Sequence, residues 1–404
     1  MRLTIIQYAG DYREAFDRFA KGGKQTYYAQ RYSVNFVGSL AQRLDQVTVI
    51  CGVTEESYDV VLDNGVRAIG AGLHPGFNPS RLVPLLSGTQ PTRLCLTSPL
   101  VPLLKWAKTN RIRTIAPLAD SFEKGGLRET ARHWRLAYYL NGPFVEWIGN
   151  HGIGACLSLL KIGVAPEKVV PWDWPPSHRP SDYPPRTLGR EGSAKLLYVG
   201  SVTKTKGVGD LLQAVARLRQ QGVSAQLSII GRDADGAMTA LAHSLHLGDR
   251  VSFVGILPNE DVPAAMRAAD IVVIPSWHEY PEGLPLTIYE ALSARTPIVA
   301  SDHPMFRGAI VNGESALIFP AGNADELAAT IVRLMGNSDL YAGLSNKSEA
   351  AWHRLQLPVR WGQLLEAWLA DDPAKTEWIR DHRLASGRYD ERIKELRQAL
   401  LGSS

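Results

Sequence analysis

Short apolar runs alternate with amphipathic stretches along the whole chain. Runs rich in Val, Ile and Leu, each followed by a helical pattern, predict parallel sheets built from βαβ units. In the first half we predict strands at 3–7, 47–50, 66–69, 93–96 and 114–116. In the second half we predict strands at 196–199, 227–230, 251–254, 271–274 and 298–300.

A proline-rich stretch separates the two halves. Residues 171–186 hold six prolines in sixteen positions, and proline both fixes φ and removes a backbone donor. We therefore predict an N-terminal domain over 1–180 and a second domain over 187–355. Beyond them, Trp361, Leu364, Leu365 and Trp368 recur at helical spacing, which predicts a C-terminal crossover helix and tail over 356–404.

Composition narrows the class of protein. The 404 residues include 44 Lys and Arg against 40 Asp and Glu, a net charge of +4 that does not indicate a nucleic-acid partner. Three scattered cysteines form no metal-ligand or disulfide spacing. The N-terminal stretch carries acidic residues and no long apolar core, so it does not resemble a signal peptide, and no run reaches the roughly 18 apolar residues of a membrane span. We expect a cytoplasmic protein that uses no cofactor and no metal.

Residues 271–302 hold the strongest functional pattern. The strand at 271–274 leads into a Pro- and Gly-containing loop and then a helix from about Thr287. Glu282 precedes this helix and Glu290 lies one turn inside it, with seven residues between them. The first turn of a helix offers free N–H groups and a positive dipole end, which bind phosphate. Carboxylates beside phosphate are costly unless they accept hydroxyl hydrogen bonds, so the pattern indicates a nucleotide-sugar site.

A second strand–loop–helix pattern spans residues 196–218. Lys206 and Gly207 precede an amphipathic helix, and a lysine at such a position can neutralise a diphosphate. The spacing does not fit a P-loop. A solvated loop lysine is the alternative interpretation, which the pattern at 271–302 makes less favourable.

Four motifs in this order resemble glycosyltransferase family 4 (group 1): YVGSVTKTKG, LSIIGRD, RVSFVGILPNEDVPAAMRAADIVVIPS and EGLPLTIYEALSARTPIVASD. The likeness is close over 194–345 and loose in the first half. It implies an α/β GT-B fold, with two Rossmann-like parallel-sheet domains facing across a cleft and C-terminal helices that pack back on the N-terminal domain. It also implies a retaining glycosyltransferase whose donor is a UDP- or GDP-linked sugar.

The resemblance assigns roles residue by residue. Lys206 would contact the donor diphosphate and Glu282 the hydroxyls of the transferred sugar, while Glu290 would bind the ribose hydroxyls. The other residues that it places at the donor are Ser201, Gly231, Arg232, Gly255, Gly283, Leu284, Leu286 and Thr287.

The chain departs from the family pattern in the phosphate-binding residues. Ser201 stands where an arginine is common, which removes one positive charge from the phosphate clamp. Pro285 has no N–H group, so the phosphate must use Leu286 or Thr287.

The first half offers fewer functional candidates. Gly22 and Gly23 look like the family's Gly-rich first loop, which approaches donor phosphate and acceptor, or else a plain turn. Ala119 stands where the family commonly has a histidine, and Asp120 beside it is the best polar substitute for a catalytic role. Asp120 is equally interpretable as the N-cap of the next helix.

A basic stretch at 127–139 places Arg128, Arg132 and Arg135 at helical spacing, with Trp134 close by. Such a face can rest on an anionic membrane, at the inner face of the cell membrane, although a solvated helix face is the simpler interpretation. Together these features predict a retaining, metal-independent glycosyltransferase of polysaccharide or glycolipid biosynthesis. The alternatives are a non-catalytic GT-B subunit or sugar-binding partner and, third, a nucleotide-sugar epimerase.

Overall fold

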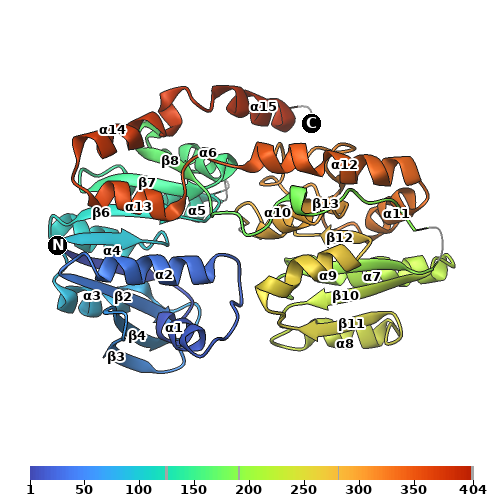
Figure 1. Ribbon diagram of the computed structural model, residues 1–404, viewed down its shortest axis with the longest axis horizontal. Helices are drawn as coiled ribbons and strands as arrows, with labels where there is room; N and C mark the ends of the chain where they lie inside the picture. The colour runs from blue at the N-terminus through green and yellow to red at the C-terminus, as the bar shows by residue number, and fades with distance from the viewer. Residues whose placement is uncertain (123–125, 190–191, 281, 402–404) are drawn as a thin grey trace. The chain divides into compact units, whose positions relative to one another are not determined.

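The computed structural model describes residues 1–122, 126–189, 192–280 and 282–401. The chain forms two compact units (Figure 1). The first comprises Met1–Gln25, Ala29–Pro175 and Leu357–Ile393, and the second comprises Thr26–Tyr28, Pro176–Gln356 and Lys394–Ser404. The change of unit at Pro175 falls inside the proline-rich stretch. Thr26–Tyr28, which the sequence division placed in the N-terminal domain, belong by their contacts to the second unit.

The first unit is built on an eight-stranded sheet with the order β3-β4-β2-β1-β5-β6-β7-β8. Every pairing is parallel except that of the edge strand β3 with β4. The strands are β1 (Arg2–Gln7), β2 (Gln46–Val53), β3 (Ser57–Val61), β4 (Arg67–Leu73), β5 (Arg93–Leu96), β6 (Arg113–Leu118), β7 (Val145–His151) and β8 (Val169–Trp172).

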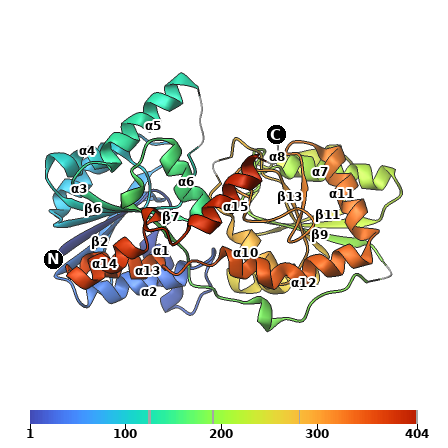
Figure 2. The same ribbon diagram turned by 90° about the horizontal axis from the view of Figure 1, so that it is seen from above.

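Helices cover both faces of this sheet (Figure 2). One face carries α1 (Tyr12–Ala20), α2 (Gln30–Ala41), α13 (Trp361–Leu369) and α14 (Pro373–Asp381). The other face carries α3 (Val83–Thr89), α4 (Val101–Thr109), α5 (Leu127–Leu140) and α6 (Ile153–Lys161). The predicted C-terminal helix is confirmed as α13, whose Trp361, Leu364, Leu365 and Trp368 are buried in the core of the first unit.

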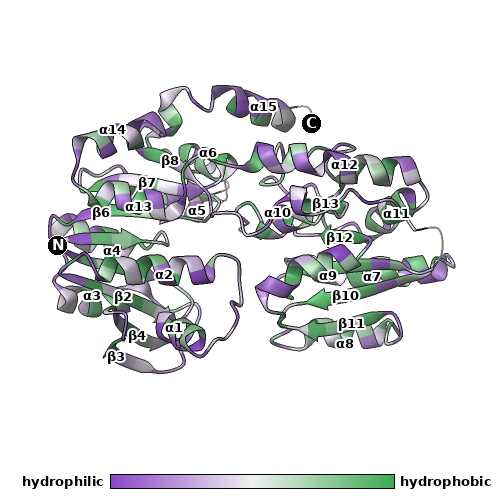
Figure 3. Ribbon diagram, in the orientation of Figure 1, coloured by the Kyte–Doolittle hydropathy of each residue, from purple (hydrophilic) through white to green (hydrophobic). Residues whose placement is uncertain are grey.

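The second unit is built on a six-stranded parallel sheet with the order β11-β10-β9-β12-β13-β14. Figure 3 shows its inner strands in hydrophobic colour, as burial on both faces requires. The strands are β9 (Ala194–Val199), β10 (Ala225–Ile230), β11 (Val251–Gly255), β12 (Ile271–Ile274), β13 (Ile298–Ser301) and β14 (Leu317–Phe319). The helices are α7 (Val208–Gln220), α8 (Ala237–Ser244), α9 (Val262–Ala268), α10 (Leu286–Ser293), α11 (Ala324–Met335) and α12 (Ser338–Leu355). The last helix, α15 (Asp390–Leu401), belongs to the first unit up to Ile393 and to the second from Lys394.

All ten predicted strands are confirmed, and four further strands were missed: β3, β7, β8 and β14. The proline-rich stretch is less irregular than predicted. Its first two residues, Pro171 and Trp172, end the edge strand β8, where a missing donor is tolerated. Pro180–Asp182 forms a single turn of 3₁₀-helix.

Candidate functional site

Lys206 lies in the loop that joins β9 to α7. Gly207 ends this loop with a φ of +72°, and a Cβ there would stand 1.9 Å from the carbonyl oxygen of Pro275. Glycine is thus required both by the backbone conformation and by the close approach of the 275–277 segment. The loop carries Lys206 to Glu282, with which its ammonium group forms an ion pair. The same ammonium lies 4.4 Å from the centroid of the Tyr280 ring.

Glu282 lies in the connection between β12 and α10 and is almost fully buried. Besides Lys206, its Oε1 accepts a hydrogen bond of 2.7 Å from the Ser276 hydroxyl. Ser276 is held in turn, because its carbonyl oxygen accepts a 2.6 Å hydrogen bond from the Ser301 hydroxyl at the end of β13. The structure therefore brings together two residues that the sequence separates by 76 positions.

The N-terminus of α10 follows Glu282 after Gly283 and Leu284. Pro285 is the N-cap residue, and within the described residues no side chain caps the helix. The backbone N–H groups of Leu286 and Thr287 occupy the first turn, at the positive end of the helix dipole. The Thr287 side chain donates to the carbonyl of Val199 at 3.3 Å, which ties the start of α10 to the end of β9.

Glu290 lies inside α10 and is buried. Burial raises its pKa to about 7, and a hydrogen bond from Asn259 opposes that rise. The Asn259 side-chain amide donates to Glu290 Oε1 at 2.6 Å. The pKa of Glu290 therefore lies near neutral pH. A ligand that donates hydrogen bonds to the carboxylate can then favour its ionised form.

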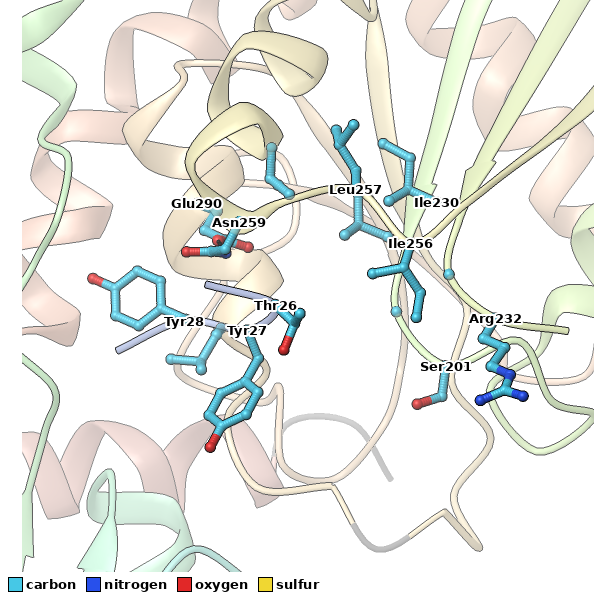
Figure 4. Close-up of a pocket in the computed structure, with 15 residues that line it drawn as sticks. Thr26, Tyr27, Tyr28, Ser201, Ile230, Arg232, Ile256, Leu257, Asn259 and Glu290 are labelled. Atoms are coloured by element: carbon cyan, nitrogen blue, oxygen red, sulfur yellow. Dashed lines mark hydrogen bonds between the residues drawn. The ribbon is translucent and has the colours of Figure 1, made fainter. Parts of the chain in front are cut away.

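A cavity of about 420 Å³ in the second unit is lined by Leu286 and Glu290, whereas Lys206, Glu282 and Thr287 are not among its lining residues (Figure 4). Five predicted donor residues line it: Ser201, Gly231, Arg232, Leu286 and Glu290. Gly255 itself does not line the cavity, but the two residues that follow it do. The cavity is lined in addition by Thr26, Tyr27, Tyr28, Val199, Gly200, Ile230, Ile256, Leu257, Asn259 and Val262.

Two contributions to this cavity were missed from the sequence. Asn259 lies in a short 3₁₀ turn after β11, inside the third of the family motifs, but no role was assigned to it. Tyr27 and Tyr28 come from the N-terminal part of the chain, and the Tyr28 hydroxyl accepts a hydrogen bond of 3.1 Å from the Ser177 amide. In the sequence, the pair of adjacent tyrosines that follows Gly22 and Gly23 did not by itself indicate a place at this cavity.

The remaining candidates lie in the first unit. Gly22 adopts a φ of +76° in the turn after α1, and a Cβ on Gly23 would clash with Arg18. Asp120 follows β6, and burial raises the pKa of its carboxyl to about 6. The alternative interpretation of Asp120 as a helix N-cap is wrong, because α5 begins at Leu127 with Gly126 as its N-cap.

Helix α5 presents the predicted basic face. Arg128, Arg132 and Arg135 are exposed, and the Trp134 side chain is 69% exposed. Arg132 pairs with Glu129 at 3.0 Å. No helix in the described part of the chain is long and apolar enough to cross a membrane. Among the same residues, no group of three or more His, Cys, Asp or Glu side chains is arranged to hold a metal ion.

A sequence model of the family "Glycosyl transferases group 1" matches residues 182–351, the part of the chain that holds Lys206, Glu282 and Glu290. This match covers less than half of the chain and lies within the second unit. The amylovoran biosynthesis glycosyltransferase AmsK of Erwinia amylovora is 32% identical over 151 residues, which cover 36% of this chain and 37% of that protein. The phosphatidyl-myo-inositol mannosyltransferase of Mycolicibacterium smegmatis is 27% identical over 180 residues, 44% of this chain and 45% of that protein.

The chain therefore matches about two fifths of the length of these relatives. Solved structures extend the likeness across both units. The structure of Anabaena HepE in complex with UDP and glucose aligns with a TM-score of 0.64 at 15% identity, covering 92% of this chain and all of that one. At that identity the likeness concerns the fold, and the predicted GT-B fold is confirmed.

Proposed function

We propose that the protein is a glycosyltransferase that moves a sugar from a nucleoside diphosphate to an acceptor hydroxyl. The observation that carries the proposal is the grouping of Lys206, Glu282 and the start of α10 in the part of the chain that matches glycosyltransferase group 1, where Glu290 lines a cavity. A cation, a helix N-terminus that no described side chain caps and two buried carboxylates match the parts of one nucleotide sugar.

Each part of the donor has a partner of suitable chemistry. Glu290 accepts hydrogen bonds from the ribose hydroxyls, at the edge of a largely apolar cavity that suits a base. Lys206 and the N–H groups of Leu286 and Thr287 neutralise the diphosphate. Glu282 accepts hydroxyls of the transferred sugar. Before the donor binds, Glu282 and Lys206 satisfy each other.

The difficult step is the breaking of the bond between the anomeric carbon and the diphosphate oxygen. Negative charge then grows on the leaving diphosphate, where Lys206 and the α10 dipole stabilise it without a metal ion. The resemblance to family 4 supports retention, with the acceptor oxygen attacking from the face that the diphosphate leaves. The acceptor proton passes to the departing phosphate, so no separate base is required, although Asp120 remains a candidate for one.

The donor and acceptor classes rest on relatives. UDP in the HepE complex favours a UDP-linked donor over a GDP-linked one. The names of the amylovoran and phosphatidylinositol enzymes support polysaccharide or glycolipid biosynthesis. A lipid-linked acceptor fits α5, whose basic face would rest on an anionic membrane surface through Arg128, Arg132, Arg135 and Trp134.

Product analysis in the absence of an acceptor separates this proposal from its alternatives. The purified protein is incubated with UDP- and GDP-sugars, and the products are resolved by chromatography. A transferase releases nucleoside diphosphate and free sugar slowly, by transfer to water. Conversion of the donor to an isomeric nucleotide sugar would indicate an epimerase, and an unchanged donor bound without turnover would indicate a non-catalytic subunit.

A further inference from the structure

The proposed diphosphate site is assembled from two loops that are far apart in sequence. Lys206 comes from the β9–α7 loop, whereas Glu282 and the start of α10 come from the chain after β12. A diphosphate is stabilised only if both loops meet it at once. The contacts that fix one loop against the other therefore decide how well the charge is held.

Trp277 makes the contacts that join these loops. Its backbone amide donates to the carbonyl of Thr205 at 2.8 Å, next to Lys206. Its indole Nε1–H donates to Asp210 Oδ2 at 2.5 Å, in the first turn of α7. The Lys204 ammonium lies 5.5 Å from the centroid of the Trp277 ring. One side chain thus anchors the loop after β12 to the helix that follows the lysine loop.

Asp210 has no role in the donor contacts described above, yet it is buried, with 7% of its surface exposed. A buried carboxylate is costly unless it is hydrogen-bonded, and an apolar pair of similar volume would pack at lower cost. It also places negative charge at the start of α7, close to the loop that must attract a diphosphate. The positive end of the α7 dipole and the charge of Lys204 offset part of that cost, and the hydrogen bond from Trp277 ties the carboxylate to the loop after β12.

We infer that Asp210 and Trp277 are positioning residues, which hold the Lys206 loop and the Glu282 loop in the arrangement that a nucleoside diphosphate requires. This inference rests on the proposed function. Neither side chain touches the donor. Their hydrogen bonds run between the β9–α7 loop, α7 and the chain after β12, so we expect their effect at the phosphate end.

The test compares the affinities of paired nucleotides, which separate the phosphate end from the nucleoside end. UMP and UDP, and GMP and GDP, are titrated calorimetrically into the wild type and into Trp277→Phe, which keeps the ring beneath Lys204 but loses the N–H donor. In Trp277→Phe we expect the preference for the diphosphate over the monophosphate to fall about tenfold, with the affinity for the monophosphate unchanged. The reason is that the Lys206 loop is no longer held where its charge-assisted contacts meet the second phosphate.

Asp210 supplies the partner variants. Asp210→Asn keeps an oxygen that accepts the indole N–H and should retain the preference, whereas Asp210→Leu should lose it as Trp277→Phe does. The double variant Trp277→Phe with Asp210→Leu should lose no more than either single variant, because one interaction is removed in all three. Gln213→Ala, an exposed position on the same helix, is the control.

The outcomes separate the two levels of the argument. A wild type that binds none of the four nucleotides contradicts the proposed function. A wild type that prefers the diphosphate, together with a Trp277→Phe variant of unchanged preference, overturns the positioning role alone. Equal losses for monophosphate and diphosphate also overturn it, since they indicate general disruption of the unit.

Discussion

The charge of the Glu290 carboxyl group near neutral pH depends on its burial, which raises its pKa. Its pKa is raised by burial from an ordinary 4.5 to about 7, and a ribose site needs the ionised form to accept two hydroxyls. We therefore expect the affinity for a nucleotide sugar to rise with pH from 6 to 8. Nucleotide sugars suit this measurement because their diphosphate diester has no proton that titrates near pH 7. Calorimetric titration of UDP-glucose across that range provides the readout.

The free protein should show the opposite trend. Because the folded-state pKa of Glu290 lies above its unfolded value, the folded state binds more protons between pH 4.5 and pH 7. The contribution of Glu290 to the free energy of unfolding is therefore present at low pH and is lost as pH rises through about 7. Glu290→Gln should remove this contribution and flatten the affinity profile. Profiles identical to wild type would contradict the assignment of Glu290.

At the residue scale, the sequence predicted the charged side chains better than their supports. Glu282, Glu290 and Lys206 stood at fixed distances from a strand end and a helix start, and strand ends meet at one edge of a parallel sheet. Asn259 and Trp277 carried no such signal. Their roles depend on contacts between segments 31 and 67 residues apart, which no local pattern encodes.

At the element scale, α13 shows how the C-terminal chain completes the first unit. Trp361 is 4% exposed and lies in the same core cluster as β1 and α2. We expect Trp361→Ala to lower the free energy of unfolding by about 3–5 kcal/mol, because it removes a large buried side chain. Denaturant unfolding followed by circular dichroism measures the effect. Trp134→Ala, the same substitution at a position 69% exposed, is the matched control and should change stability little.

Helix α5 bears an exposed stripe that packing does not explain. Leu127, Trp134 and Tyr138 are 92%, 69% and 51% exposed, and they recur at helical spacing beside three arginines. We expect the protein to float with vesicles that contain phosphatidylglycerol and not with phosphatidylcholine vesicles alone, and binding should weaken as salt is raised.

Two variants distinguish the charged from the apolar contribution of α5. Arg128→Gln with Arg135→Gln should reduce flotation at low salt, while Trp134→Ala should reduce the part that survives at high salt. All three positions are exposed, so stability should not change. Flotation of both variants like the wild type would leave α5 as a solvated helix face.

Among whole elements, the strands that escaped prediction each lack a long, uninterrupted apolar run. β3 is an edge strand in which exposed residues alternate with partly buried ones. β7 interrupts its apolar run with Glu146, which pairs with Arg113. β8 carries Pro171, a residue that argues against a strand unless the strand lies at an edge. β14 is only three residues long. Three of these four strands, β3, β8 and β14, lie at sheet edges, whereas β7 is an inner strand whose apolar run is broken by a charge.

At the scale of the whole molecule, fold and function rest on different evidence. The fold is shared with HepE over 92% of this chain at only 15% identity, so it constrains the chemistry weakly. The family match covers residues 182–351 and leaves out the first unit, where sequence signals for an acceptor were weakest. The account of function therefore depends on the grouping in the second unit that joins Lys206, Glu282 and Glu290.

Donor turnover in matched variants tests that grouping most directly. Release of UDP from UDP-glucose and related donors is measured for the wild type, Lys206→Met and Glu282→Gln, with Gln213→Ala as a control. We predict slow release by the wild type and the control, and a fall of about 100-fold in kcat/KM for each of the other two, as for the loss of one transition-state donor. Equal turnover in all four proteins, or none in the wild type with every UDP- and GDP-sugar, would contradict the account.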